Sequence, residues 1–333
     1  MTTPSELERS IAPRGSWFKT YGRWLLLAVG IVIVGVLIRN VGYARLWIVL
    51  RGSGVWLPPI IALEIVMAVL DLWGIRAIAG RKASEIPPAD WLRSSLIAYA
   101  CMILLPAGRA AGELARAAVL SKSVGAARAT AWTTRLFAIS LIAVGLTSLA
   151  LSAVLLTWFG PSENLVRLLG LNAVAALACG VGVLAAAAHV RMAGWLARLV
   201  RRISPGVEID IGSESVKRTW RAALLALTTA RVLQTFQYGL IVLAVGGTLT
   251  VKSSAMAQGI HLLGASVGDV IPNQVGVLEG AYRLFADILG FSASPERALA
   301  IALLARAAQL SLSLLCLAAF SILGRGERAA ATP

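Results

Sequence analysis

Two prolines in this sequence are each followed, seven residues later, by a glutamate. Pro106 precedes Glu113, and Pro272 precedes Glu279. Proline interrupts a helix, and the N-terminus of the next helix offers free N–H groups and a positive dipole end to an anion. A glutamate there pairs with an arginine or exchanges a proton. The spacing therefore predicts two similar sites for a charged group.

An arginine follows each glutamate inside the next apolar segment. Arg135 follows Glu113, and Arg306 follows Glu279. A buried carboxylate or guanidinium group is costly unless it is paired or hydrated. We therefore expect these four side chains to face one another or a wet cavity. Two interpretations stay open for the glutamates, which either contact a substrate or only lock helices together.

The elements that position these residues are membrane helices. Of the 333 residues, 58% are hydrophobic and 14% are charged, and the mean hydropathy is +0.79. The apolar residues fall into runs of about 17–25, long enough to cross a bilayer as helices. The net charge is +15, and the basic residues that produce it lie between these runs. This location favours a role in orienting the protein in the membrane over a role in nucleic-acid binding. The fold class predicted is all-α, a polytopic helical membrane protein.

We predict a single membrane domain over residues 1–333, with about six full spans and two re-entrant, broken-helix hairpins. The hairpins are expected at about 91–120 and 256–290, and a cytoplasmic loop at about 191–221. The expected full spans are about 24–38, 55–75, 130–159, 165–190, 222–246 and 298–323.

Helix-breaking residues define the two hairpins. Residues 106–112 and 269–276 interrupt apolar segments, and the residues expected to break the helices are Pro106, Gly108, Gly112, Pro272 and Gly276. The distribution of basic residues predicts a cytoplasmic (inner) cell membrane with both termini cytoplasmic. The hairpins then enter from opposite sides, as an internal inverted repeat over about 91–150 and 256–322. Segment 39–54 has three arginines and no acid, so its placement stays open.

These residues resemble the membrane domain of the lysylphosphatidylglycerol synthase family, a flippase-like domain that also occurs alone. The resemblance rests on residues 105–113 (LPAGRAAGE) with Arg116, and on residues 272–279. It implies a polytopic helical fold and a role in lipid translocation. Asn273 and Gln274 stand where members commonly have glycines, so the preferred headgroup is expected to differ. The aminoacyl-transferase domain of the bifunctional synthases is lacking, so lipid aminoacylation is not implied.

The leading hypothesis is a lipid translocase that moves a polar or anionic lipid, or a lipid-linked headgroup, between leaflets by alternating access. No catalytic residue, metal or cofactor is expected. The expected partner is an anionic phospholipid or lipid-linked headgroup, bound by Arg109, Glu113, Arg116, Arg135, Arg231, Asn273, Gln274, Glu279 and Arg306. Replacing either Glu113 or Glu279 by Gln is expected to abolish translocation in a folded protein.

Two other classes of function are considered. One is a non-transporting scaffold or regulator of a lipid or glycan synthesis enzyme, with that enzyme or a second copy of this chain as partner. The other is a lipid-modifying enzyme that uses the two glutamates as acid and base. Further polar residues in apolar segments have a structural or a substrate-binding interpretation: Glu64, Asp71, Gln234, Gln237 and His261.

Overall fold

The computed structural model describes residues 43–188, 216–269 and 274–330, with Val32, Gly35, Val36, Arg39 and Ile271. Every regular element in these ranges is helical, so the predicted all-α class is confirmed. The α-helices are α3 (Tyr43–Ser53), α4 (Leu57–Ala79), α5 (Pro88–Leu104), α6 (Gly108–Val124), α7 (Ala126–Phe159), α8 (Asn164–Ala188), α10 (Val216–Ala244), α11 (Val251–Gly268), α12 (Val277–Leu284) and α13 (Pro295–Ala330). Short 3₁₀ turns lie at Gly54–Trp56 and Gly80–Ser84.

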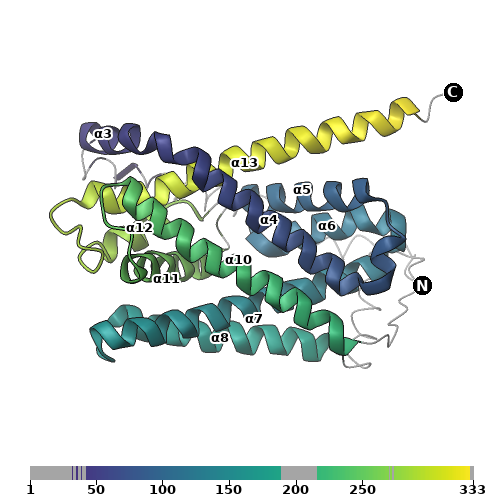
Figure 1. Cartoon of the computed structure of the whole chain (residues 1–333), viewed down its shortest axis with the longest axis horizontal. Coiled ribbons are helices and arrows are strands. Elements are labelled where there is room, and N and C mark those ends of the chain that lie inside the picture. Colours follow the sequence, from purple (N-terminus) through teal and green to yellow (C-terminus); the bar gives the residue numbers. More distant parts are fainter. Residues whose placement is uncertain are drawn as a thin grey trace, which may run out of the picture.

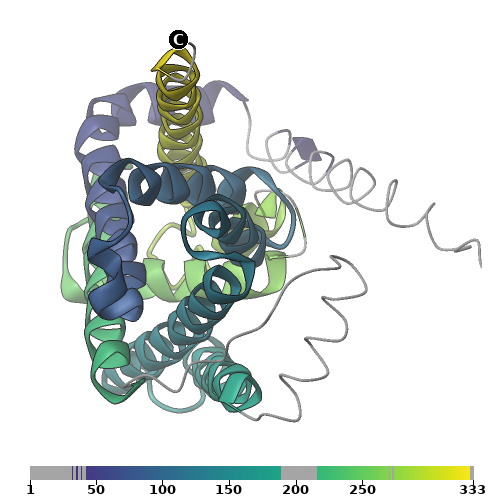
Figure 2. The ribbon, with the colours of Figure 1, turned by 90° about the vertical axis from the view of Figure 1, so that its right-hand side faces the viewer.

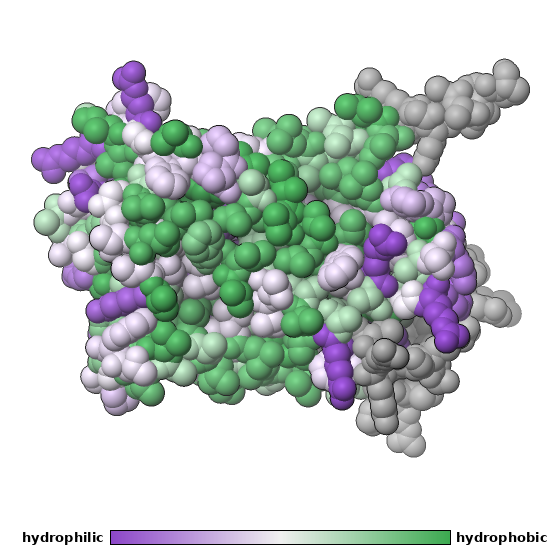
Figure 3. All heavy atoms as spheres, in the orientation of Figure 1, coloured by the Kyte–Doolittle hydropathy of each residue, from purple (hydrophilic) through white to green (hydrophobic). Residues whose placement is uncertain are grey.

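The long helices run roughly along one axis of the molecule (Figure 1). Hydrophobic side chains cover its middle, and hydrophilic ones gather at its two ends (Figure 3). Four stretches are long and apolar enough to cross a membrane, namely Tyr43–Ser84, Ala126–Phe159, Asn164–Ala187 and Pro295–Leu323. An apolar belt between two polar ends is what a bilayer requires of a spanning bundle. The chain is a multi-pass membrane protein.

Helix α10 is also long, but its two faces differ. Leu225, Val232 and Phe236 are exposed, whereas Gln234 and Gln237 are buried in the bundle. In lipid, an apolar face turns outward and polar side chains turn toward protein or a cavity. Helix α10 therefore lies between lipid and the interior of the bundle.

Segment 39–54, whose placement the sequence left open, is largely helical from residue 43 to residue 56 and leads directly into α4. Ser53, the last residue of α3, contacts the end of α10, because its Oγ donates to the carbonyl oxygen of Ala244 at 2.9 Å. The predicted first span and residues 191–215 of the predicted loop lie outside the described residues, apart from the few named above. Residues 216–221 begin α10 rather than a loop.

A break between helices lies at each predicted interruption, but the first is shorter than predicted, because residues 108–112 belong to α6 and Gly112 does not break the helix. Helix α5 ends at Leu104 and α6 begins at Gly108, while α11 ends at Gly268 and α12 begins at Val277. Ala107 has a φ of 67°, a left-handed conformation that a continuing helix does not contain. The α5–α6 pair and the α11–α12 pair lie toward opposite ends of the long axis (Figure 1). In the view along this axis, α5 and α6 lie nearer the viewer and α11 and α12 lie behind them (Figure 2).

Candidate functional site

A cavity of about 450 Å³ lies inside the bundle, next to the two interruptions. Helices α4, α5, α6, α7, α8, α10, α11 and α13 all contribute side chains to its wall. Most of the wall is apolar, but seven of the lining side chains are aspartate, glutamate or arginine: Glu64, Asp71, Arg109, Glu113, Arg116, Arg231 and Asp269. A cavity with so many ionisable groups inside a membrane bundle is a candidate site for a charged ligand.

Four of these residues form a closed ring of ion pairs, which we call the charge cluster: Asp71, Arg109, Glu113 and Arg116. The two oxygens of Asp71 accept hydrogen bonds from Nη2 of Arg109 and Nη2 of Arg116. The oxygens of Glu113 lie 3.0 Å from Arg109 Nε and 3.3 Å from Arg116 Nε. Two negative and two positive groups cancel, which allows a set of charges to be buried at lower cost.

The spacing of residues along α6 explains why three of its charged side chains meet. Arg109, Glu113 and Arg116 are separated by four and three residues, so they share one helix face. Leu114 lies elsewhere on the helix and is 70% exposed. Gly112 packs against α5, where an added Cβ would lie 2.6 Å from the carbonyl oxygen of Ala98. The glycine predicted as a helix breaker is therefore a contact point between two helices.

The tips of the two broken pairs touch each other. The N–H of Ala107 donates to the carbonyl oxygen of Asp269 at 3.0 Å. At Gly108, an added Cβ would lie 2.2 Å from Oδ1 of Asp269. Two segments separated by more than 150 residues of sequence thus meet at the edge of the cavity, as expected if the interruptions face one another.

Substituting Gly108 tests how closely the tips must approach. Gly108→Ala places a methyl group against Asp269 and also strains a residue whose φ is +37°. We expect a loss of about 1–3 kcal/mol in unfolding free energy. Gly182→Ala in α8 is the matched control, since its Cβ meets nothing within 4 Å. Unfolding in mixed detergent micelles measures both variants, and equal stabilities would contradict a close contact at the tips.

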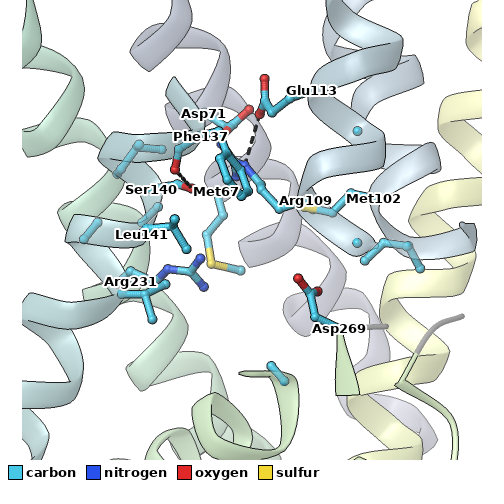
Figure 4. A pocket seen from close by; sticks show the side chains of 18 of the residues that line it. Met67, Asp71, Met102, Arg109, Glu113, Phe137, Ser140, Leu141, Arg231 and Asp269 are labelled. Atoms are coloured by element: carbon cyan, nitrogen blue, oxygen red, sulfur yellow. Dashed lines mark hydrogen bonds and ion pairs between the residues drawn. The ribbon is translucent and has the colours of Figure 1, made fainter. Parts of the chain in front are cut away.

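Two charged side chains of the wall, Arg231 and Asp269, reach into the cavity and form no ion pair within the described residues. Arg231 donates from Nη1 to Oε1 of Gln234 at 2.7 Å. Nε2 of Gln258 donates to the same oxygen at 3.1 Å. Asp269 is at the end of α11. Figure 4 shows both side chains reaching into the cavity, on sides away from Asp71 and Glu113. A ligand can therefore contact these two groups without breaking an ion pair.

Glu64 and Asp71, seven residues apart on α4, both line the cavity. Neither acid forms an ion pair with Arg231. Asp71 belongs to the charge cluster, and Glu64 accepts hydrogen bonds from Tyr99 Oη at 3.0 Å and from Gln237 Nε2 at 3.2 Å. The sequence singled out Asp71 as an acid within an apolar helix and left a structural and a substrate-binding interpretation open.

The second glutamate behaves differently from the first. Glu279 is 0% exposed, pairs with Arg306 through both oxygens, and accepts the N–H of Gly276 at 2.9 Å. The expected Glu279–Arg306 pair is therefore present, but neither residue lines the cavity. Because Glu279 caps α12 itself, the N-terminus of this helix has its own internal anion.

Of the four charged side chains expected to face one another or a wet cavity, Glu113 lines the cavity and forms no ion pair with Arg135. Glu113 instead pairs with Arg109 and Arg116 of its own helix. Arg135 is partly buried on α7, outside the cavity lining, and has no ion pair among the residues described. Arg109 and Arg116 lie one helical turn from Glu113, and side chains at that separation lie close enough on the helix surface to pair with its carboxylate.

The remaining predicted residues lie at the second interruption. Gln274 lines the cavity and has a φ of 53°, and Gly276 has a φ of 85°. Pro272 and Asn273 lie outside the described residues.

His261 lines the cavity, and its Nδ1 lies 2.6 Å from Tyr238 Oη. Over the described ranges, no group of three or more His, Cys, Asp or Glu side chains is arranged to hold a metal ion.

Comparison with known proteins agrees with the resemblance found in the sequence. A family model described as the lysylphosphatidylglycerol synthase TM region matches residues 23–316. No curated protein and no solved structure matches the chain. The match includes every helix around the cavity and both interruptions. The chain therefore belongs to the lysylphosphatidylglycerol synthase transmembrane-region family.

Proposed function

We propose that this protein moves polar lipids between the two leaflets, with the headgroup in the central cavity and the acyl chains in the surrounding lipid. The observation that carries the proposal is the cavity itself, which holds charged side chains at the meeting point of two interrupted helices. Transporters commonly place a polar substrate at such a point. The membrane-lipid role of the family is consistent with this function.

In this proposal the two broken pairs are re-entrant hairpins that enter from opposite sides of the cytoplasmic membrane. Their location toward opposite ends of the bundle supports that arrangement (Figure 1). It corresponds to six full spans, an inverted repeat over about 91–150 and 256–322, and termini on the cytoplasmic side. Rocking of one repeat against the other opens the cavity to each leaflet in turn.

The headgroup phosphate is held by Arg231, in our proposal, because this guanidinium faces the cavity and has no carboxylate within ion-pair distance in the described part of the chain. Gly108, the first residue of α6, lines the cavity. The N-terminus of this helix therefore adds N–H donors and the positive end of its dipole to the phosphate site. The predicted equivalent at α12 contributes less, since Glu279 occupies it. Arg109 and Arg116 exchange Asp71 for phosphate as the cavity opens.

A reconstituted translocation assay tests the function. The purified protein is placed in liposomes that contain phosphatidylglycerol with a fluorescent label on an acyl chain, and a membrane-impermeant quencher reports the outer leaflet. We expect quenching of nearly all of the probe with protein, and of about half without it, because a symmetric bilayer divides lipid equally. Chemical change of the lipid would indicate an enzyme, and no movement of the probe would favour a scaffold.

Arg231→Gln tests the proposed phosphate contact. A hydrogen bond to a charged group contributes about 1.5–3 kcal/mol, so we expect the initial rate of probe movement to fall about tenfold or more. Arg283→Gln is the matched control, since Arg283 is exposed on α12 and does not line the cavity. A wild-type rate in Arg231→Gln would exclude Arg231 from headgroup binding.

A further inference from the structure

The carboxyl groups of the cavity differ in what compensates their charge. Asp71 and Glu113 each contact two arginines. Asp269 has no arginine partner but is only partly buried. Glu64 is 6% exposed and contacts no arginine or lysine within ion-pair distance in the described structure. It is therefore the one acid of the described wall that is both buried and unmatched by a cation.

Neutral hydrogen-bonding groups surround Glu64 on the helices packed against α4. Tyr99 Oη of α5 lies 3.0 Å from Oε2, and Gln237 Nε2 of α10 lies 3.2 Å from Oε1. Gln309 of α13 also lies beside Glu64, and Arg231 is a charged group that acts on it. Tyr238 is the other titratable neighbour on α10. The α7 side chains of the wall have no titratable group: Phe137, Ser140, Leu141, Ala143 and Val144.

This surrounding suits both protonation states of a carboxyl group. A buried carboxylate without a bound cation is costly inside a membrane, whereas the neutral acid is not. The Tyr99 hydroxyl both donates and accepts, so it donates to the carboxylate and accepts from the acid at the same distance. A proton can therefore bind or leave without rearrangement of the helices, and the cavity provides its route.

We propose that Glu64 binds a proton that crosses the membrane together with the lipid headgroup. This inference rests on the proposed lipid translocation and adds its energy source. A phosphate at Arg231 offsets the attraction of this arginine for the Glu64 carboxylate, so the phosphate and the proton favour each other's binding. The carboxylate takes the proton from water on one side of the membrane. With the proton and the headgroup bound, the cavity closes to that side and opens to the other, where the proton returns to water. No other reactant is needed.

The test uses the same liposomes with a pH difference across the membrane, and with the membrane potential held at zero by potassium and valinomycin. Wild-type protein should accumulate the labelled phosphatidylglycerol in the leaflet that faces the alkaline side, by up to about tenfold per pH unit for one proton per lipid. Reversing the pH difference should reverse the accumulation. Glu64→Gln should equilibrate the probe and leave the leaflets equal. Gln keeps hydrogen bonds to Tyr99 and Gln237, so the variant should fold.

Three results would count against this scheme, and they are distinguishable. Movement of the probe by wild-type protein without any response to the pH difference would overturn proton coupling and leave the translocase intact. Accumulation by Glu64→Gln at the wild-type level would overturn the assignment to Glu64. No movement by the wild-type protein under any condition would overturn the proposed function and the coupling together.

A second measurement does not depend on lipid movement. Infrared difference spectra should show a carboxylic-acid band that declines as the pH rises in the wild-type protein and is missing in Glu64→Gln. Glu85→Gln, at an exposed position beyond α4, should keep the band. If the band is the same in wild type and Glu64→Gln, Glu64 does not bind the proton. A purely structural glutamate would leave this spectrum unchanged with pH.

Discussion

Glu279→Gln should lower the free energy of unfolding by about 3–5 kcal/mol, because it leaves a buried guanidinium without its carboxylate. Glu279 is fully buried, and Arg306 is 8% exposed. Both oxygens of the glutamate contact this arginine. Gln keeps the oxygen that accepts the N–H of Gly276, so the loss measures the charge rather than the helix cap. Equilibrium unfolding in mixed detergent micelles gives the value.

Two variants make this result interpretable. Glu279→Gln combined with Arg306→Met removes both charges and should recover part of the stability, since a buried pair is often replaceable by apolar side chains. Glu85→Gln is the same substitution at an exposed site and should change stability by less than about 0.5 kcal/mol. If Glu279→Gln is as stable as the wild type, the pair does not hold α12 against α13.

Glu113→Gln should reduce probe movement to the level of protein-free liposomes while the protein stays folded. The charge cluster is formally neutral, with two acids and two arginines, and this change gives it one net positive charge. Phosphate should then bind Arg109 and Arg116 more tightly. A site that holds its substrate too strongly stops transport, because the substrate must also leave.

The expected signature of Glu113→Gln is therefore stronger binding together with slower movement. Binding of labelled phosphatidylglycerol to the protein in detergent measures the first, and the quenching assay measures the second. Glu85→Gln again serves as the control with an exposed glutamate. Normal movement in Glu113→Gln would remove this residue from the mechanism, and weaker binding would contradict the role of the cluster.

The two glutamates thus have different expected effects, although the sequence assigns them the same role. Glu113 lines the cavity, whereas Glu279 lies outside it and caps α12. For Glu279 the structure favours the locking interpretation that the sequence left open. Translocation by Glu279→Gln, measured on the fraction that remains folded, should persist.

The sequence by itself determined the features that depend on nearby residues. Runs of apolar residues define the long helices, and Pro106 with its neighbouring glycine ends α5 where it was expected to end. The residues 269–276 likewise interrupt the chain before α12. These features are local, because helix formation and its interruption depend on a few consecutive residues. The family follows from the same segments.

Only the tertiary structure decided which charged groups meet. Asp71 lies 38 residues before Arg109 in the sequence, yet it bridges Arg109 and Arg116. Arg135 was expected to face the other charged side chains or a wet cavity, but in the described part of the chain it forms no ion pair and does not line the cavity. Contacts between helices depend on how each helix is rotated about its own axis and on the depth of each residue in the membrane. The spacing of residues along one helix determines neither of these. For the same reason, only the packing of the helices around one cavity shows that Arg231 has no ion pair in the described part of the chain and that Glu64 is buried.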